Sequence, residues 1–166
     1  MPADLVLGVD PGLAATGWAL VERKGSRLVG AGCGTLRTLP RTPHAERLAA
    51  LNRGIGEILA GRAVVGAAVE SWFVHPVSRA AMAMAEARGA VLVAIAQAGV
   101  EVAEYPPTEI KKAVTGSGSA DKTQVRVMVA ALCGTLPDGD HAADALAAAI
   151  CHLSRAPLRA AIRRAQ

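Results

Sequence analysis

The chain has 166 residues, 52% of them hydrophobic, and carries a formal net charge of +4 with a pI of about 9.3. This length allows one domain with a substantial core and excludes two full domains, and the apolar content excludes a disordered chain. A basic chain of this size favours a polyanionic partner, although a compositional bias towards arginine gives the same charge.

We expect neither a membrane span nor a secretion signal. The longest apolar stretch, 80–98, is interrupted by Glu86, Arg88 and Gln97, so no segment offers about 20 consecutive apolar residues. The chain has three cysteines, Cys33, Cys133 and Cys151. Their spacing matches no zinc or redox pattern, and free thiols indicate a cytoplasmic protein.

The first predicted elements are strands. Short apolar runs indicate strands at 5–10, 17–23 and 27–37. The turn Lys24-Gly25-Ser26 joins the second and third strands, so the chain is expected to open with antiparallel hairpins. A helix follows from Thr42-Pro43 to about residue 60, with an inner stripe formed by Leu48, Leu51, Ile55, Ile58 and Leu59.

The second half alternates strands with helices. Residues 63–70 form a continuous apolar run, which is typical of a strand buried on both faces. After a loop at 71–77, the predicted elements are a helix at 78–98, a strand at 100–105, and helices at 108–114, 121–133 and 141–154, with a basic, frayed tail at 155–166. We therefore predict a single α/β domain over residues 1–166, with a five-stranded mixed sheet and helices on both faces.

Two of the apolar strands end in an acid. Asp10 closes the first strand and Glu70 closes the fourth. If both strands are central and parallel, the two carboxylates lie close together, and a divalent cation such as Mg²⁺ or Mn²⁺ relieves their repulsion. Two alternatives stay open: Asp10 sets the turn at Pro11-Gly12, and Glu70 only reaches solvent.

A third group of acids opens the last helix, in the segment DGDHAADALA at 138–147. His141 and Asp144 are three residues apart and share a helix face, and Asp140 suits the N-cap position. The alternative is that Asp144 only interacts favourably with the helix dipole while His141 is a surface residue.

Several segments resemble the RuvC-type Holliday junction resolvases. They are LGVDPGLAATGWALVE, AVESWF through AEARG, YPPTEIKKAVTGSGSADKTQVRVMV and HAADALAAAICH, in the order of that family and over nearly the whole chain. The resemblance implies an RNase H-like fold and a homodimer. It also implies a metal-dependent endodeoxyribonuclease that resolves four-way DNA junctions in recombination and repair, leaving 5′-phosphate and 3′-hydroxyl ends.

The resemblance places the metal ligands on Asp10, Glu70, His141 and Asp144, with two metal ions per subunit. Position 141 departs from the acidic version of the family pattern, and Asp140 is the alternative ligand. We favour His141 because the AAD that follows it keeps the family's register. An imidazole suits Mn²⁺ better than Mg²⁺, so stronger activity with Mn²⁺ is expected.

The expected DNA contacts lie near these ligands. Phe73 matches a base-contacting aromatic of the family, although Phe73 and its neighbour Trp72 could also fill a core gap. Lysines around the flexible GSGS segment at 116–119 suit a phosphate backbone, or form a solvated turn. The predicted basic contacts are Lys111, Lys112, Lys122 and Arg126.

The helix at 78–98 is apolar on more than one side, so we expect it to meet both the sheet and a second subunit, or else to be buried in a monomer core. The family also implies a branch-migration motor as a partner. Two rival functions stay open: a junction-binding protein that has lost catalysis, and an RNase H-like nuclease that acts on RNA.

Overall fold

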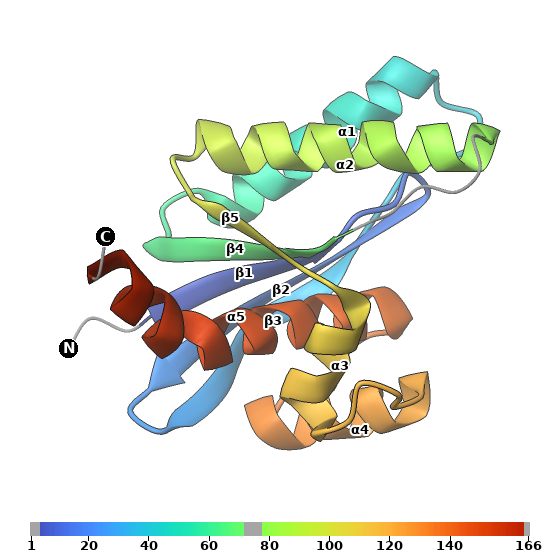
Figure 1. Ribbon diagram of the computed structural model, residues 1–166. Coiled ribbons are helices and arrows are strands. Elements are labelled where there is room, and N and C mark those ends of the chain that lie inside the picture. Colours follow the sequence, from blue (N-terminus) through green and yellow to red (C-terminus); the bar gives the residue numbers. More distant parts are fainter. Residues whose placement is uncertain (1–3, 72–77, 165–166) are drawn as a thin grey trace.

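The computed structural model describes residues 4–71 and 78–164, with side chains up to residue 155. One five-stranded sheet lies between two layers of helices (Figure 1). The strand order is β3-β2-β1-β4-β5, with antiparallel pairs β3–β2 and β2–β1 and parallel pairs β1–β4 and β4–β5. The predicted mixed sheet is confirmed.

The strands lie within a few residues of their predicted bounds. They are β1 (Asp4–Asp10), β2 (Ala15–Lys24), β3 (Arg27–Arg37), β4 (Val64–Glu70) and β5 (Val102–Tyr105). Side chains of β1 alternate between the two faces, so that Val6 faces one helix layer while Leu7 and Val9 face the other. This two-sided burial explains why β1 and β4 are nearly continuous apolar runs.

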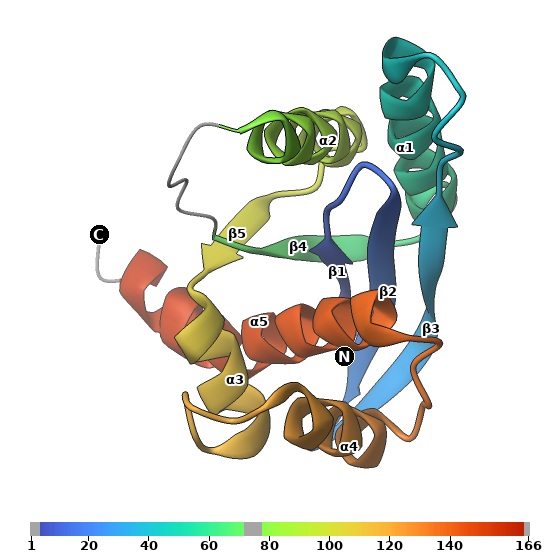
Figure 2. The ribbon, with the colours of Figure 1, turned by 90° about the vertical axis from the view of Figure 1, so that its right-hand side faces the viewer.

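Helices cover both faces, as predicted. They are α1 (His44–Leu59), α2 (Arg79–Gln97), α3 (Pro107–Thr115), α4 (Lys122–Cys133) and α5 (Asp140–Arg164). Figure 2 shows α1 and α2 on one side of the sheet and α5 crossing the other, with α3 and α4 beyond it. A capping box between Asp121 and Gln124 starts α4 immediately after the GSGS segment.

The prediction that the last helix ends at residue 154 was wrong, because α5 continues to Arg164 and includes most of the predicted tail. Pro157 lies inside this helix and has no N–H to donate to the C=O of Leu153. The guanidinium of Arg23 on β2 donates to that oxygen instead, with Nη2 at 2.5 Å. A donor from the sheet thus replaces the hydrogen bond that proline removes.

By length and composition alone, α2 is the one helix among the described residues that could cross a membrane. In this fold α2 packs against α1 and against the sheet. Its buried side chains are Ala87, Val91, Ala94 and Ile95, whereas Met82, Met84 and Val93 are exposed. Met82 and Val93 share the side of α2 away from the core, so the helix has a core face and an outer face with apolar side chains that the described residues do not cover.

Helix α5 lies directly against β1 and β2. A Cβ on Gly8 would stand 1.9 Å from the carbonyl oxygen of Ala145, and a Cβ on Gly17 would stand 2.0 Å from that of His141. The alanines of 142–149 are at most 4% exposed, so small side chains meet glycines along the contact. This close packing sets the first turn of α5 beside the end of β1.

Candidate metal and nucleic-acid site

Asp10 and Glu70 lie side by side at one edge of the sheet. Their strands are neighbours and parallel, and Val9 pairs with Val69, so both acids follow at the same level. The alternation of side chains along each strand puts Asp10 on the α5 face with Val6, and Glu70 on the same face with Ala68. The expected proximity of these two strand ends is confirmed.

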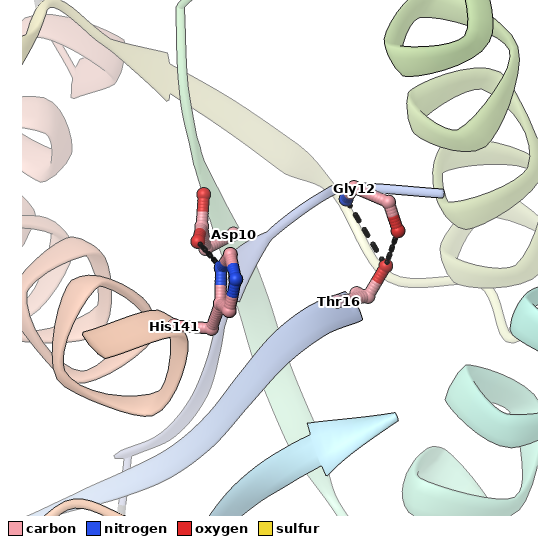
Figure 3. A network of polar contacts seen from close by, with 4 residues as sticks. All are labelled: Asp10, Gly12, Thr16 and His141. Carbon is pink, nitrogen blue, oxygen red and sulfur yellow. Dashed lines mark hydrogen bonds and ion pairs between the residues drawn. The ribbon is translucent and has the colours of Figure 1, made fainter. Parts of the chain in front are cut away.

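The first turn of α5 adds a ring nitrogen to this edge. His141 Nδ1 lies 2.7 Å from Asp10 Oδ2, and Figure 3 shows the imidazole directed at that carboxylate. Asp144 follows one turn later on α5 and is half-buried. Asp140 is the first residue of the helix rather than its predicted N-cap, and its Oδ1 lies 3.5 Å from Arg126 Nη1.

The turn after Asp10 is held in place by a buried hydroxyl. Thr16 is fully buried, and its Oγ1 accepts from the N–H of Gly12 at 3.2 Å and donates to the C=O of Gly12 at 2.8 Å (Figure 3). Asp10 therefore precedes a fixed turn, as the alternative reading proposed, and also contacts His141. The segment that starts at Asp10 thus forms the turn and also contributes a carboxylate to the site.

The carboxylates of the site influence one another. Desolvation raises the pKa of Glu70, and the charges of Asp10 and Asp144 raise it further, against the opposing effect of Lys111 and Lys122. The pKa of Asp144 is raised by desolvation and then by Asp10, while Lys122 and His141 act in the opposite direction. Both carboxylates are therefore destabilised by partial burial and by neighbouring negative charge, and bound cations would stabilise them.

This donor set suits a hard divalent cation, because carboxylate oxygens dominate it and one imidazole completes it. Within residues 4–71 and 78–155, no three His, Cys, Asp or Glu side chains are grouped closely enough to hold a metal ion as they stand. The geometry seen is the His141–Asp10 contact together with the electrostatic interaction of Glu70 and Asp144 with Asp10.

Two of the predicted basic residues lie at the site. Lys111 and Lys122 line one pocket together with Glu70 and Asp144. Lys112 is exposed on α3 and, within the part of the chain that the structure describes, does not line that pocket. Besides its pair with Asp140, Arg126 donates from Nη2 to the C=O of Pro137 at 3.5 Å, so it braces the start of α5. Trp72 and Phe73 lie outside the described residues.

One residue of the site was not assigned from the sequence. Arg88 on α2 lines a second pocket with Asp10, Pro11, Glu70 and Met84. The sequence held one signal for it, since Arg88 is one of the few charged residues in a largely apolar helix. Such a charge, once buried, needs partners from neighbouring elements.

Asp144→Asn is expected to stabilise the protein in the absence of divalent cations. Because the folded protein holds the Asp144 proton to higher pH than the unfolded chain does, the free energy of unfolding falls as pH rises through that interval. At pH 7.5 with a chelator, the variant should be about 1 kcal/mol more stable, or roughly 2–4 °C higher in Tm. Thermal denaturation at pH 7.5 and below about pH 4 checks this, since the difference should vanish at the acidic end.

Comparisons with known proteins match one family over most of the chain. The family model described as crossover junction endodeoxyribonuclease RuvC matches residues 6–152. A relative of that name from Azorhizobium caulinodans is 46% identical over 162 residues, which cover 96% of this chain and 95% of the relative. A second, from Parvibaculum lavamentivorans, is 46% identical over 154 residues, covering 92% of this chain and 88% of the relative.

Solved structures show the same fold. Thermus thermophilus RuvC in complex with Holliday junction substrate has a TM-score of 0.87 and 34% identity, over 94% of this chain and 96% of that one. The structure titled Thermus thermophilus RuvC structure gives 0.83 at 34% identity, over 93% and 96%. Fowlpox virus resolvase, at 10% identity and a TM-score of 0.55 over 90% of this chain and 98% of that one, shares the fold alone. This chain therefore belongs to the RuvC family of crossover junction endodeoxyribonucleases, which have an RNase H-like fold.

Proposed function

We propose that this chain resolves four-way DNA junctions by paired, symmetric, metal-dependent nicks that leave 5′-phosphate and 3′-hydroxyl ends, in recombination and repair. One observation carries the proposal: Asp10, Glu70, His141 and Asp144 come from three separate elements and surround one edge of the sheet. The family membership and the junction-bound structure of the Thermus thermophilus relative support it.

Asp10, Glu70, His141 and Asp144 would hold two divalent ions per subunit, either Mg²⁺ or Mn²⁺. Asp140 suits this role less well, because its carboxylate is paired with Arg126 while His141 contacts Asp10. When bound, such ions activate water and stabilise the leaving oxygen of a phosphodiester. The chain's own part is to hold the carboxylates in a fixed relation and to keep His141 Nδ1 directed towards Asp10.

Lys111 and Lys122 would bind the phosphate on either side of the scissile bond. They line the pocket of Glu70 and Asp144, and their charges oppose the negative field there. Lysines so placed attract the backbone without reading sequence. Lys112 and Arg126 would extend the basic surface, and Phe73 would contact bases at the branch point.

Two matched cuts need two active sites related by two-fold symmetry, so we propose a homodimer. Two exposed apolar side chains on the side of α2 away from the core, Met82 and Val93, offer a surface for a second subunit. Each subunit would then present one site to one strand of the junction. A cytoplasmic location and a branch-migration motor as further partner belong to the same proposal.

Cleavage of a synthetic four-way junction in Mn²⁺ tests the function. Two symmetric nicks, in strands of like polarity and sealable by a ligase, are expected. Binding without nicks under every divalent metal would instead assign a junction-binding protein. Cleavage of RNA–DNA hybrids in preference to junctions would assign an RNase H-like nuclease that acts on RNA.

His141 should set the metal preference. An imidazole ligand favours Mn²⁺ over Mg²⁺, so the cleavage rate at saturating metal should be higher with Mn²⁺. In His141→Asp, the ratio of the two rates should fall on the order of tenfold, because an oxygen ligand suits Mg²⁺ better. His44→Asn, which changes an exposed histidine on α1, is the matched control and should leave the ratio unchanged. Equal wild-type rates in the two metals would contradict this role.

A further inference from the structure

The backbone at the end of β4 bonds alternately to its two neighbours. The N–H of Ala67 donates to the C=O of Glu101 at 2.8 Å, and the N–H of Ser71 donates to the C=O of Tyr105 at 2.7 Å. Odd-numbered residues of β4 therefore bond towards β5. Even-numbered residues bond towards β1, since successive residues of a strand point their backbone groups to opposite sides. Glu70 accordingly directs its C=O to the β1 side.

On that side, the sheet has no donor for the Glu70 carbonyl. Val69 pairs with Val9, so the N–H that would meet the Glu70 oxygen in a parallel ladder belongs to residue 11. Residue 11 is Pro11, which has no N–H. Because Pro11 follows Asp10, the C=O of Glu70 at the end of β4 receives no hydrogen bond from the backbone of β1.

Arg88 supplies the missing donor. Its Nη1 donates to the C=O of Glu70 at 2.9 Å, and its Nη2 lies 2.8 Å from Oε1 of Glu104 on β5. The Arg88 side chain is 14% exposed, whereas the side chain of Glu104 is 50% exposed, so the guanidinium is mostly buried while its partners reach the surface. One planar guanidinium thereby joins α2 to the ends of β4 and β5.

We propose that Arg88 is a positioning residue for the metal site, which it serves by fixing the backbone of Glu70. This inference rests on the proposed function. A guanidinium presents two parallel donors in a rigid fork, so it can hold the Glu70 carbonyl and the Glu104 carboxylate at once. With its carbonyl fixed, Glu70 keeps its carboxylate beside Asp10, where both acids line the same pocket as Arg88.

Mn²⁺ binding to the DNA-free protein tests this role, measured from the electron paramagnetic resonance signal of free Mn²⁺. Arg88→Met should weaken Mn²⁺ binding about tenfold or more, the usual cost of losing a group that supports a metal ligand. Arg88→Lys, which keeps the charge but donates from a single nitrogen, should recover part of that affinity. Glu104→Gln keeps an oxygen acceptor and should give a smaller loss in the same direction, and it preserves the test if Arg88→Met fails to fold.

Val91→Ala separates positioning from plain stability. Val91 is fully buried one turn along the same helix and touches neither acid, so its truncation should cost about 1–3 kcal/mol of stability with Mn²⁺ affinity unchanged. Wild-type Mn²⁺ affinity in both Arg88 variants and in Glu104→Gln would overturn the proposal. The proposal would also be overturned if Val91→Ala and Arg88→Met lost equal Mn²⁺ affinity at an equal loss of Tm.

The wild-type protein and Asp10→Asn distinguish failure of this inference from failure of the function. If wild type binds Mn²⁺ no better than Asp10→Asn, the metal site itself is wrong and both proposals fall. If wild type binds Mn²⁺ well, Asp10→Asn does not, and the Arg88 variants match wild type, only the role of Arg88 is wrong.

Discussion

Asp10→Asn is expected to reduce junction cleavage about 10³-fold or more, because the cations that stabilise the transition state contribute several kcal/mol. Asp10 is the central acid of the site: it contacts His141 at 2.7 Å and raises the pKa of both Glu70 and Asp144. Asparagine keeps the size of the side chain and removes the charge, so the fold should persist.

Single-turnover cleavage of a labelled four-way junction measures this effect, and a gel-shift assay in Ca²⁺ measures binding. Junction affinity should change little, because Lys111 and Lys122 are unaltered. Asp140→Asn is the matched control: its carboxylate is paired with Arg126, so cleavage should stay near the wild-type rate. Normal cleavage in Asp10→Asn, or its loss in Asp140→Asn alone, would show that the ligand set has been assigned wrongly.

The sequence predicts most of this fold because each main element has a local cause. Strands β1 and β4 are apolar on both faces and each ends in one acid, so their burial between two helix layers could be inferred. Their parallel pairing, on which the meeting of Asp10 and Glu70 depends, could only be assumed. The segment that starts α5 carries His141 and Asp144 at a spacing that only a helix brings to one face.

The features that the sequence does not predict are contacts between distant elements. Arg126 looks like a free cation in the sequence, but the fold brings Asp140 beside it. Pro157 indicates a helix end, yet Arg23 from the sheet supplies a donor to Leu153 and the helix continues. In both cases a guanidinium finds a partner more than ten residues away, which no local pattern records.

Arg88 extends this rule to the site. A proline in the turn after Asp10 removes a donor from the sheet, and an arginine of a different layer replaces it at Glu70. A proline in the sequence shows that one backbone N–H donor is missing. Which side chain donates to the carbonyl left unpaired can be seen only in the structure. In this chain Arg88 donates to the carbonyl left unpaired by Pro11, and Arg23 donates to the carbonyl left unpaired by Pro157.

Close approach of α5 to the sheet makes Gly17 a second sensitive point. Gly17 pairs with Asp10 across β1 and β2, and with Thr35 across β2 and β3, so its backbone is held on both sides. A Cβ there would stand 2.0 Å from the carbonyl oxygen and 2.3 Å from the carbonyl carbon of His141. Relief must come from a shift of the first turn of α5, which carries His141.

Gly17→Ala should therefore cost about 1–3 kcal/mol of stability, the usual price of overpacking. It should also lower junction cleavage on the order of 10²-fold, since a displacement of about 1 Å at a reactive group has that effect. Chemical denaturation and single-turnover cleavage below the melting range measure the two losses separately. Gly56→Ala is the matched control: it lies inside α1 with open space around a Cβ, and should gain up to about 1 kcal/mol with cleavage unchanged. If Gly17→Ala loses stability and cleaves normally, cleavage does not depend on the exact position of the first turn of α5, and the proposed ligand role of His141 is contradicted.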